Sequence, residues 1–252
     1  MPNRRPFPRP SVGQAVLAST LAVILACVVI IVGVNLSRVD AGAASNSAPA
    51  PYLSAEPTPD RTSTRPRAIF IGDSYVAGSG ASADSRKWTS IVSASEGWFE
   101  INVGRGGTGY VTTSDVSGCG KQYCPNYDQM VRTAEAANVS IVLVAGGQND
   151  FIAWATNPTK VSAAIAKTYA DLREGMPNAR IIAVGPSTAG GFATTVVEFD
   201  AAVQSAAASV GAEYVSLLDP PVLDPSMLIP DGSQINDAGH AAIAARVLQS
   251  IG

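Results

Sequence analysis

Ser74 and His240 are the two residues of this chain best suited to nucleophilic chemistry. A serine hydroxyl is a weak nucleophile at neutral pH and needs a base beside it. Imidazole is the usual base because its pKa lies near neutrality, and His240 is the single histidine among 252 residues. Serine chemistry in this protein therefore depends on which side chain reaches Ser74.

Ser74 lies in the motif Gly72-Asp73-Ser74, which directly follows the apolar run at residues 68–71. Three small polar residues after a strand are also ordinary turn chemistry, so this motif alone is a weak signal. It differs from the Gly-x-Ser-x-Gly turn of α/β-hydrolases, since Val76 stands where the second glycine belongs. Its position at the end of an apolar run makes Ser74 a candidate nucleophile.

Gly107 follows the apolar run at residues 99–103, and Asn149 follows the apolar run at residues 141–145. A backbone N–H and a side-chain amide at such positions can together stabilise an oxyanion, although Asn149 and Asp150 are also common residues for capping the next segment. Residues 104–109 satisfy the dinucleotide pattern G-x-G-x-x-G, which needs a helix starting at the glycines and an acidic residue closing the next strand. A polar loop with two cysteines follows here, and the next apolar run ends in glycine, so dinucleotide binding is disfavoured.

The elements that must position these residues alternate along the chain. Brief β-branched runs predict buried parallel strands, at Ala68–Ile71, Phe99–Val103, Ile141–Ala145, Arg180–Val184 and Glu213–Leu217. Helical patterns cover residues 86–95, 127–137, 157–175, 194–209 and 237–250. The alternation predicts a three-layer α/β/α sandwich with a central parallel sheet. Ligands bind such sheets beyond the carboxyl ends of the strands, where the candidate residues lie.

In order, spacing and placement, these three strand ends resemble the GDSL/SGNH hydrolase family over residues 67–252. The resemblance implies an SGNH/flavodoxin-like sandwich in which Ser74 is the nucleophile. It also implies an oxyanion hole made by the N–H groups of Ser74 and Gly107 and the amide of Asn149. Family members hydrolyse or transfer acyl esters of lipids, carbohydrates and small molecules without a metal or organic cofactor, so we expect an acyl-ester substrate and no cofactor.

The last block of the family, Asp-x-x-His before the final helix, is altered in this chain. Asp231 takes the acid position, but the base position falls on Gln234, and His240 matches a second histidine that the family does not use as base. An alternative register takes Asp237 and His240 as the Asp-x-x-His pair, which would put the histidine inside the helix. A glutamine amide cannot accept a proton near neutral pH. Three hypotheses follow: a serine esterase or acyltransferase with His240 as substitute base beside Ser74 and Asp231, an impaired or engineered esterase with Gln234 in the base position, or a binding module that has lost its base.

Residues 1–66 predict export and membrane attachment. Residues 15–36 contain no charge and span about 33 Å as a helix, enough for one bilayer crossing. Arginines before this segment favour a cytoplasmic segment 1–14 and an extracellular domain at 67–252. Residues 37–66, rich in Pro, Ala, Ser and Thr, predict a disordered linker. The alternative is secretion after signal-peptide cleavage near Ala43.

Composition narrows the partners. The net charge of −3 disfavours nucleic acid, whose phosphates require a basic face. Cys119 and Cys124 are predicted to form a disulfide in an oxidising exterior. Two cysteines and one remote histidine are too few for a zinc site, so no metal is expected. The sequence leaves the oligomeric state open.

Overall fold

The computed structural model describes residues 64–190 and 193–252. The predicted cytoplasmic segment 1–14, the membrane anchor 15–36 and almost all of the linker 37–66 lie outside these residues. Within the described part of the chain, no helix combines the length and apolar character needed to cross a bilayer.

Five parallel strands form the central sheet in the order β2-β1-β3-β4-β5. They are β1 (Arg67–Gly72), β2 (Phe99–Asn102), β3 (Ile141–Ala145), β4 (Arg180–Val184) and β5 (Glu213–Val215). The three central strands are buried almost throughout, as expected for strands covered on both faces. Because all five run in the same direction, their carboxyl ends meet at one edge of the sheet.

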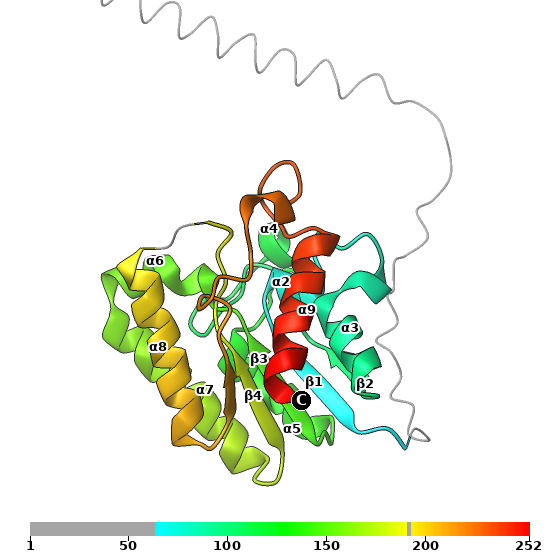
Figure 1. The fold of residues 1–252 in the computed structure, drawn as a ribbon. Helices are drawn as coiled ribbons and strands as arrows, with labels where there is room; N and C mark the ends of the chain where they lie inside the picture. The colour runs from blue at the N-terminus through cyan, green and yellow to red at the C-terminus, as the bar shows by residue number, and fades with distance from the viewer. Residues whose placement is uncertain (1–63, 191–192) are drawn as a thin grey trace, which may run out of the picture. The chain divides into compact units, whose positions relative to one another are not determined.

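Helices cover both faces of the sheet, so the predicted three-layer α/β/α architecture is confirmed (Figure 1). The helices are α2 (Ser74–Ala77), α3 (Trp88–Ser95), α4 (Val116–Cys119), α5 (Tyr127–Ala136), α6 (Phe151–Thr156), α7 (Pro158–Gly175), α8 (Thr194–Ser209) and α9 (Asp237–Ile251). Helices α3 and α9 lie side by side over one face, where they pack on Phe70 and Leu143. Helices α5, α7 and α8 cover the other face, against Ile71 and Val144.

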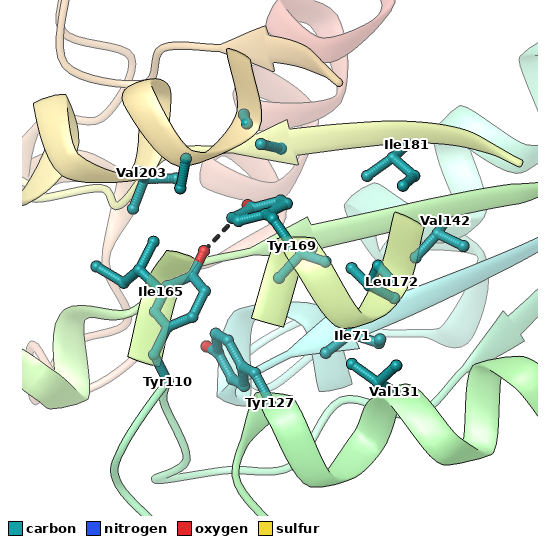
Figure 2. Packing of buried hydrophobic residues seen from close by; sticks show 14 of the residues in the cluster. Ile71, Tyr110, Tyr127, Val131, Val142, Ile165, Tyr169, Leu172, Ile181 and Val203 are labelled. Atoms are coloured by element: carbon teal, nitrogen blue, oxygen red, sulfur yellow. Dashed lines mark hydrogen bonds between the residues drawn. The ribbon is translucent and has the colours of Figure 1, made fainter. Parts of the chain in front are cut away.

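Three buried tyrosines join the layer formed by α5, α7 and α8 to the loop that follows β2. Tyr110 precedes α5, Tyr127 begins α5, and Tyr169 lies in α7; all three are fully buried. The hydroxyls of Tyr110 and Tyr169 share a hydrogen bond of 3.1 Å, and the rings of Tyr110 and Tyr127 pack edge to face with their centroids 4.8 Å apart (Figure 2). This cluster fixes the segment after β2 to the core.

The sequence predicts every long element but misses the short ones. Strand β5 ends at Val215 instead of Leu217, because the Ser216 hydroxyl accepts the N–H groups of Leu218 and Asp219 and turns the chain. The helices α2, α4 and α6 have no more than six residues each. So few residues show no 3.6-residue apolar period, and tertiary contacts decide their conformation.

Candidate active site

The candidate nucleophile begins the short helix that follows β1. Asp73 caps this helix, since its Oδ1 accepts the N–H of Tyr75 at 2.9 Å. Ser74 is the first helical residue and is half-buried. Gly72 must lack a side chain, because a Cβ there would lie 2.2 Å from Val76 Cγ2 and 2.5 Å from the carbonyl oxygen of Ala145. The turn that carries Ser74 is thus packed tightly against the end of β3.

The Asp73 carboxyl group lies below this turn and is buried. Its Oδ2 accepts no hydrogen bond of good geometry from the described residues, although the Gly147 N–H and the Tyr127 hydroxyl lie near the carboxyl group. A Cβ on Gly146 would be 2.5 Å from this oxygen and 2.9 Å from the Tyr127 hydroxyl, so both groups flank the end of β3. Burial raises the pKa of Asp73 to about 7, although the N–H groups of Tyr75 and Gly147 and the Tyr127 hydroxyl oppose the rise. Asp73 therefore changes charge near neutral pH directly beside the candidate nucleophile.

The Gly107 loop lies against the Ser74 turn. The N–H of Arg105 donates to the carbonyl oxygen of Gly72 at 2.8 Å, and the Thr108 hydroxyl lies 3.4 Å from the same oxygen. Gly107 has a φ of +75°, a left-handed conformation that favours glycine. The Thr108 hydroxyl donates to the carbonyl oxygen of Arg105 at 2.8 Å, so the Arg105 N–H makes the hydrogen bond that joins the loop carrying Gly107 to the residue two positions before Ser74.

Asn149 lies at the end of β3, in a single 3₁₀ turn formed by Gln148–Asp150. Its Nδ2 donates to the carbonyl oxygen of Thr108 at 2.9 Å, which fixes the orientation of the amide. The side-chain amide carries two hydrogens, and this bond uses one of them. The hydrogen bonds from Gly72 through Thr108 to Asn149 bring the three strand ends together, as the sequence predicts for parallel neighbours.

Asp150 is a residue of this site that the sequence suggested only as a helix cap. Its buried carboxylate accepts the N–H of Tyr110 at 2.5 Å, the N–H of Thr112 at 3.0 Å and the Thr112 hydroxyl at 2.6 Å, with Val111 N–H at 3.3 Å. Burial raises its pKa, and these donors oppose the rise. A Cβ on Gly109 would lie 2.3 Å from Asp150 Oδ2. The sequence shows Gly109 and Asp150 as separate residues, but no pattern in it predicts that they contact each other.

Gln234, the residue in the predicted base position, packs beside the segment that follows α2. A Cβ on Gly80 would lie 3.1 Å from Gln234 Cβ. The Gln234 Oε1 is buried and has no hydrogen-bond partner among the described residues. Asp231 is exposed, and its Oδ1 accepts the N–H of Ser233 at 2.8 Å. The side-chain and backbone hydrogen bonds of Ser233 lower the pKa of Asp231, so this acid is ionised at neutral pH.

His240 is fully buried in α9, and backbone groups contact both of its ring nitrogens. Nδ1 lies 3.4 Å from the N–H of Trp88, and Nε2 lies 3.2 Å from the carbonyl oxygen of Ser79. Since Nδ1 must accept from Trp88, the proton is assigned to Nε2, which donates to Ser79. Burial lowers the pKa of His240, which favours this neutral form. His240 thus joins α9 to the first residue of α3 and to the loop that follows α2.

Asp237, the acid of the alternative Asp-x-x-His register, binds elsewhere. Its carboxylate oxygens accept the N–H of Ser82 at 2.8 Å and the Ser82 hydroxyl at 2.6 Å. Asn236 caps α9 by accepting the N–H groups of Ala238 and Gly239. The Asp237 carboxylate thus binds the loop after α2 rather than a ring nitrogen of His240.

Replacing His240 with alanine is expected to reduce stability more than activity. The change leaves the Trp88 N–H and the Ser79 carbonyl without their partner and opens a cavity, which together cost about 2–3 kcal/mol. Urea unfolding should show this loss, while ester hydrolysis per folded molecule stays within about twofold of the wild type. His240→Gln is the matched control, since its amide can accept and donate, and it should lose less stability. A drop in hydrolysis of more than about 100-fold in folded protein would instead identify His240 as the base.

Cys119 and Cys124 form a disulfide in the loop after Gly107, with their Cα atoms 6.5 Å apart. Within residues 64–190 and 193–252, no three histidine, cysteine, aspartate or glutamate side chains gather in a way that could hold a metal ion. The groups at this edge of the sheet include the Ser74 hydroxyl, backbone N–H groups, the Asn149 amide and the carboxyl groups of Asp73 and Asp150.

Comparison with known proteins identifies the family. Residues 70–242 match the model of the GDSL-like lipase/acylhydrolase family. No curated protein sequence matches the chain. The fold is similar to that of TesA, with a TM-score of 0.58 and 17% identity over 73% of this chain and 97% of TesA.

Two further structures share the fold at low sequence identity. An active-site mutant of a family two carbohydrate esterase from Clostridium thermocellum has a TM-score of 0.58 and 17% identity, over 74% of this chain and 63% of that one. The salicylyl-acyltransferase SsfX3 has a TM-score of 0.57 and 16% identity, over 75% and 55%. The matched residues include Ser74, Gly107, Asn149 and the segment from Asp231 to His240. This chain belongs to the GDSL-like lipase/acylhydrolase family.

Proposed function

We propose that the domain at residues 67–252 is a serine acyl-ester hydrolase in which Ser74 attacks the ester carbonyl. The N–H groups of Ser74 and Gly107 and the free amide hydrogen of Asn149 stabilise the negative charge that develops on the carbonyl oxygen. The observation that carries this proposal is the hydrogen-bonded path from Gly72 through Arg105 and Thr108 to Asn149. It holds the three strand ends together before any substrate binds.

The proposed enzyme turns over slowly because its base position holds Gln234. An amide orients a hydroxyl but cannot take its proton near neutral pH. Serine enzymes that lack a triad member retain about 10³–10⁴-fold catalysis over water from the oxyanion hole and binding. In this reading Asp231 is the acid that orients whichever residue occupies position 234, and His240 stabilises the fold.

The substrate we propose is an acyl ester of a cell-surface carbohydrate or lipid. The fold neighbours include a carbohydrate esterase and an acyltransferase, so transfer of the acyl group to a second hydroxyl is the related alternative to hydrolysis. Residues 15–36 would anchor the protein in the cell membrane by a single crossing, with the N-terminus cytoplasmic and the catalytic domain extracellular. Cleavage near Ala43 would release the same domain.

A second candidate function is binding of an acylated ligand without turnover. The observation that favours it is the same substitution, since Gln234 leaves Ser74 without an imidazole at the position where the family carries one. The two functions use the same strand ends and differ in the reactivity of Ser74.

A fluorophosphonate probe separates these functions. We expect slow labelling of the folded protein, located on Ser74 by mass spectrometry of peptides, because the oxyanion hole also stabilises the tetrahedral phosphorus adduct. Ser74→Ala is the matched control and should remain unlabelled. If the folded wild-type protein resists labelling over hours while a known serine esterase is labelled in the same tube, the binding module is the correct reading.

A further inference from the structure

The segment 114–124, which contains the Cys119–Cys124 disulfide, packs directly onto the glycine pair formed by Gly106 and the proposed oxyanion donor Gly107. A Cβ on Gly106 would lie 2.2 Å from the carbonyl oxygen of Gly118, and a Cβ on Gly107 would lie 2.6 Å from Ser114 Oγ. A Cβ on Gly118 would in turn lie 3.5 Å from Gly107 Cα. The two backbones touch with no space for a side chain between them.

Among the described residues, no hydrogen bond joins Ser114 or Gly118 to Gly106 or Gly107, so these two segments meet through van der Waals contact. Gly107 has a φ of +75°, and glycine reaches other backbone conformations at little cost. Gly107 lies in a turn in which the Thr108 N–H and hydroxyl donate to the Arg105 carbonyl oxygen at 3.3 and 2.8 Å. The orientation of the Gly107 N–H therefore depends on this turn and on the residues packed against it. Ser114 and Gly118 are the residues in that position.

The position of Ser114 and Gly118 depends in turn on Cys124. The backbone of Ser114 exchanges two hydrogen bonds with that of Cys124, at 3.1 and 2.8 Å. Gly118 lies in the four-residue helix α4, which is joined to the buried Cys124 by the disulfide at Cys119. A helix of one turn is unstable by itself. The disulfide is the covalent link that keeps α4 beside the glycine pair.

We propose that the segment 114–124 positions the Gly107 N–H for oxyanion binding, and that reduction of the Cys119–Cys124 disulfide lowers the reactivity of Ser74. The inference rests on the proposed function, since it assigns Gly107 as an oxyanion donor. One dithiol reductant supplies two electrons and two protons, the S–S bond breaks into two thiols, and the reductant closes into its own disulfide. Ser114 and Gly118 are positioning residues in this scheme, because they act through Gly107.

The first experiment compares the oxidised protein with protein reduced by dithiothreitol, after a thiol count has established each state. Loss of one oxyanion donor typically costs about 10²–10³-fold in rate. Misplacement of that donor is expected to slow fluorophosphonate labelling of Ser74 about tenfold and to reduce kcat for a p-nitrophenyl ester with KM within about twofold. The double variant Cys119→Ser/Cys124→Ser should react at the reduced rate with or without dithiothreitol. Equal labelling rates in the two redox states of the wild type overturn the inference.

Gly118→Ala tests the same contact with the disulfide intact. Its added Cβ would lie 2.2 Å from Ser114 Oγ, so it should displace the contact with Gly107 and reduce kcat about tenfold. Lys121→Ala, at an exposed position in the same disulfide ring, is the matched control and should react like the wild type. Wild-type kcat in Gly118→Ala would overturn the inference.

Hydrogen exchange keeps this test separate from the proposed function. On reduction, the amides of residues 106–108 are expected to exchange at least about tenfold faster, and this readout needs no reactive serine. Absence of labelling in both redox states would refute the proposed function, whereas unchanged exchange of these amides would refute the positioning role alone.

Discussion

Gln234→His is expected to raise the rate of ester hydrolysis by about 100-fold or more. A positioned general base contributes roughly 10²–10⁴-fold to such reactions. The wild-type amide can hold a hydroxyl but cannot take its proton. The substitution supplies the missing proton acceptor while the proposed nucleophile and oxyanion hole stay unchanged.

The loop that carries Gln234 is already held in place for such a residue. The carbonyl oxygen of Gln234 accepts the N–H of Ile229 at 2.9 Å. The Asn236 amide donates to the carbonyl oxygens of Ser226 and Leu228, at 2.9 and 3.0 Å. Because the Gln234 Oε1 has no partner among the described residues, the exchange breaks no side-chain acceptor bond that the structure contains. The loop that would carry the new imidazole is therefore already held in place by the hydrogen bonds of Ile229 and Asn236.

The pH dependence of the variant identifies the new group. An imidazole acts as base only when it is neutral, so kcat/KM should rise with pH through the ordinary histidine pKa of about 6.5 and then level off. Asp73, whose pKa burial raises to about 7, is present in both proteins, so the imidazole is identified by the inflection that the variant adds to the wild-type curve. Hydrolysis of p-nitrophenyl acetate across pH 5–9 measures both curves.

Two controls accompany this prediction. Gln234→Asn keeps an amide and should stay near the wild-type rate, and Ser74→Ala in the Gln234→His background should abolish the gain. If Gln234→His leaves the rate unchanged while His240→Ala abolishes turnover in folded protein, the assignment of the base position to Gln234 is wrong.

The parts of the fold that the sequence predicts well are those governed by periodicity and burial. Strands β3 and β4 have the predicted ends because their β-branched runs stop at polar or small residues. The gathering of Ser74, Gly107 and Asn149 at one edge followed from parallel strands alone. His240 falls within the helix predicted at residues 237–250, and in the structure it is buried there together with Ile243 and Val247.

The parts that the sequence could not predict are contacts between loops. The bonds of Asp150 to Tyr110 and Thr112 join residues about forty positions apart in the chain. The contact of Gly118 with Gly106 depends on a bend that only the folded loop creates. Neither has a repeating pattern, because each depends on where the sheet places two irregular segments.

Asp150→Ala is expected to reduce the free energy of unfolding by about 3–5 kcal/mol. The carboxylate accepts backbone N–H groups from Tyr110 and Thr112 and the Thr112 hydroxyl. Leaving a buried donor unpaired costs about 1–3 kcal/mol for each group. Several donors lose their acceptor at once here, so the cost exceeds that of a typical single substitution.

Urea unfolding followed by circular dichroism measures this loss, with Asp128→Ala as the control. Asp128 bonds Lys167 at 3.0 Å in an ion pair whose lysine side chain is 59% exposed, and such surface pairs contribute about 0–1 kcal/mol. Asp150→Asn should fall between the two, because its amide keeps one acceptor oxygen but turns an NH₂ group toward backbone donors. A loss below about 1 kcal/mol for Asp150→Ala would mean that water replaces the carboxylate. In that case the loop that carries Gly107 would be fixed by its bonds to Gly72 and Asn149 rather than by Asp150.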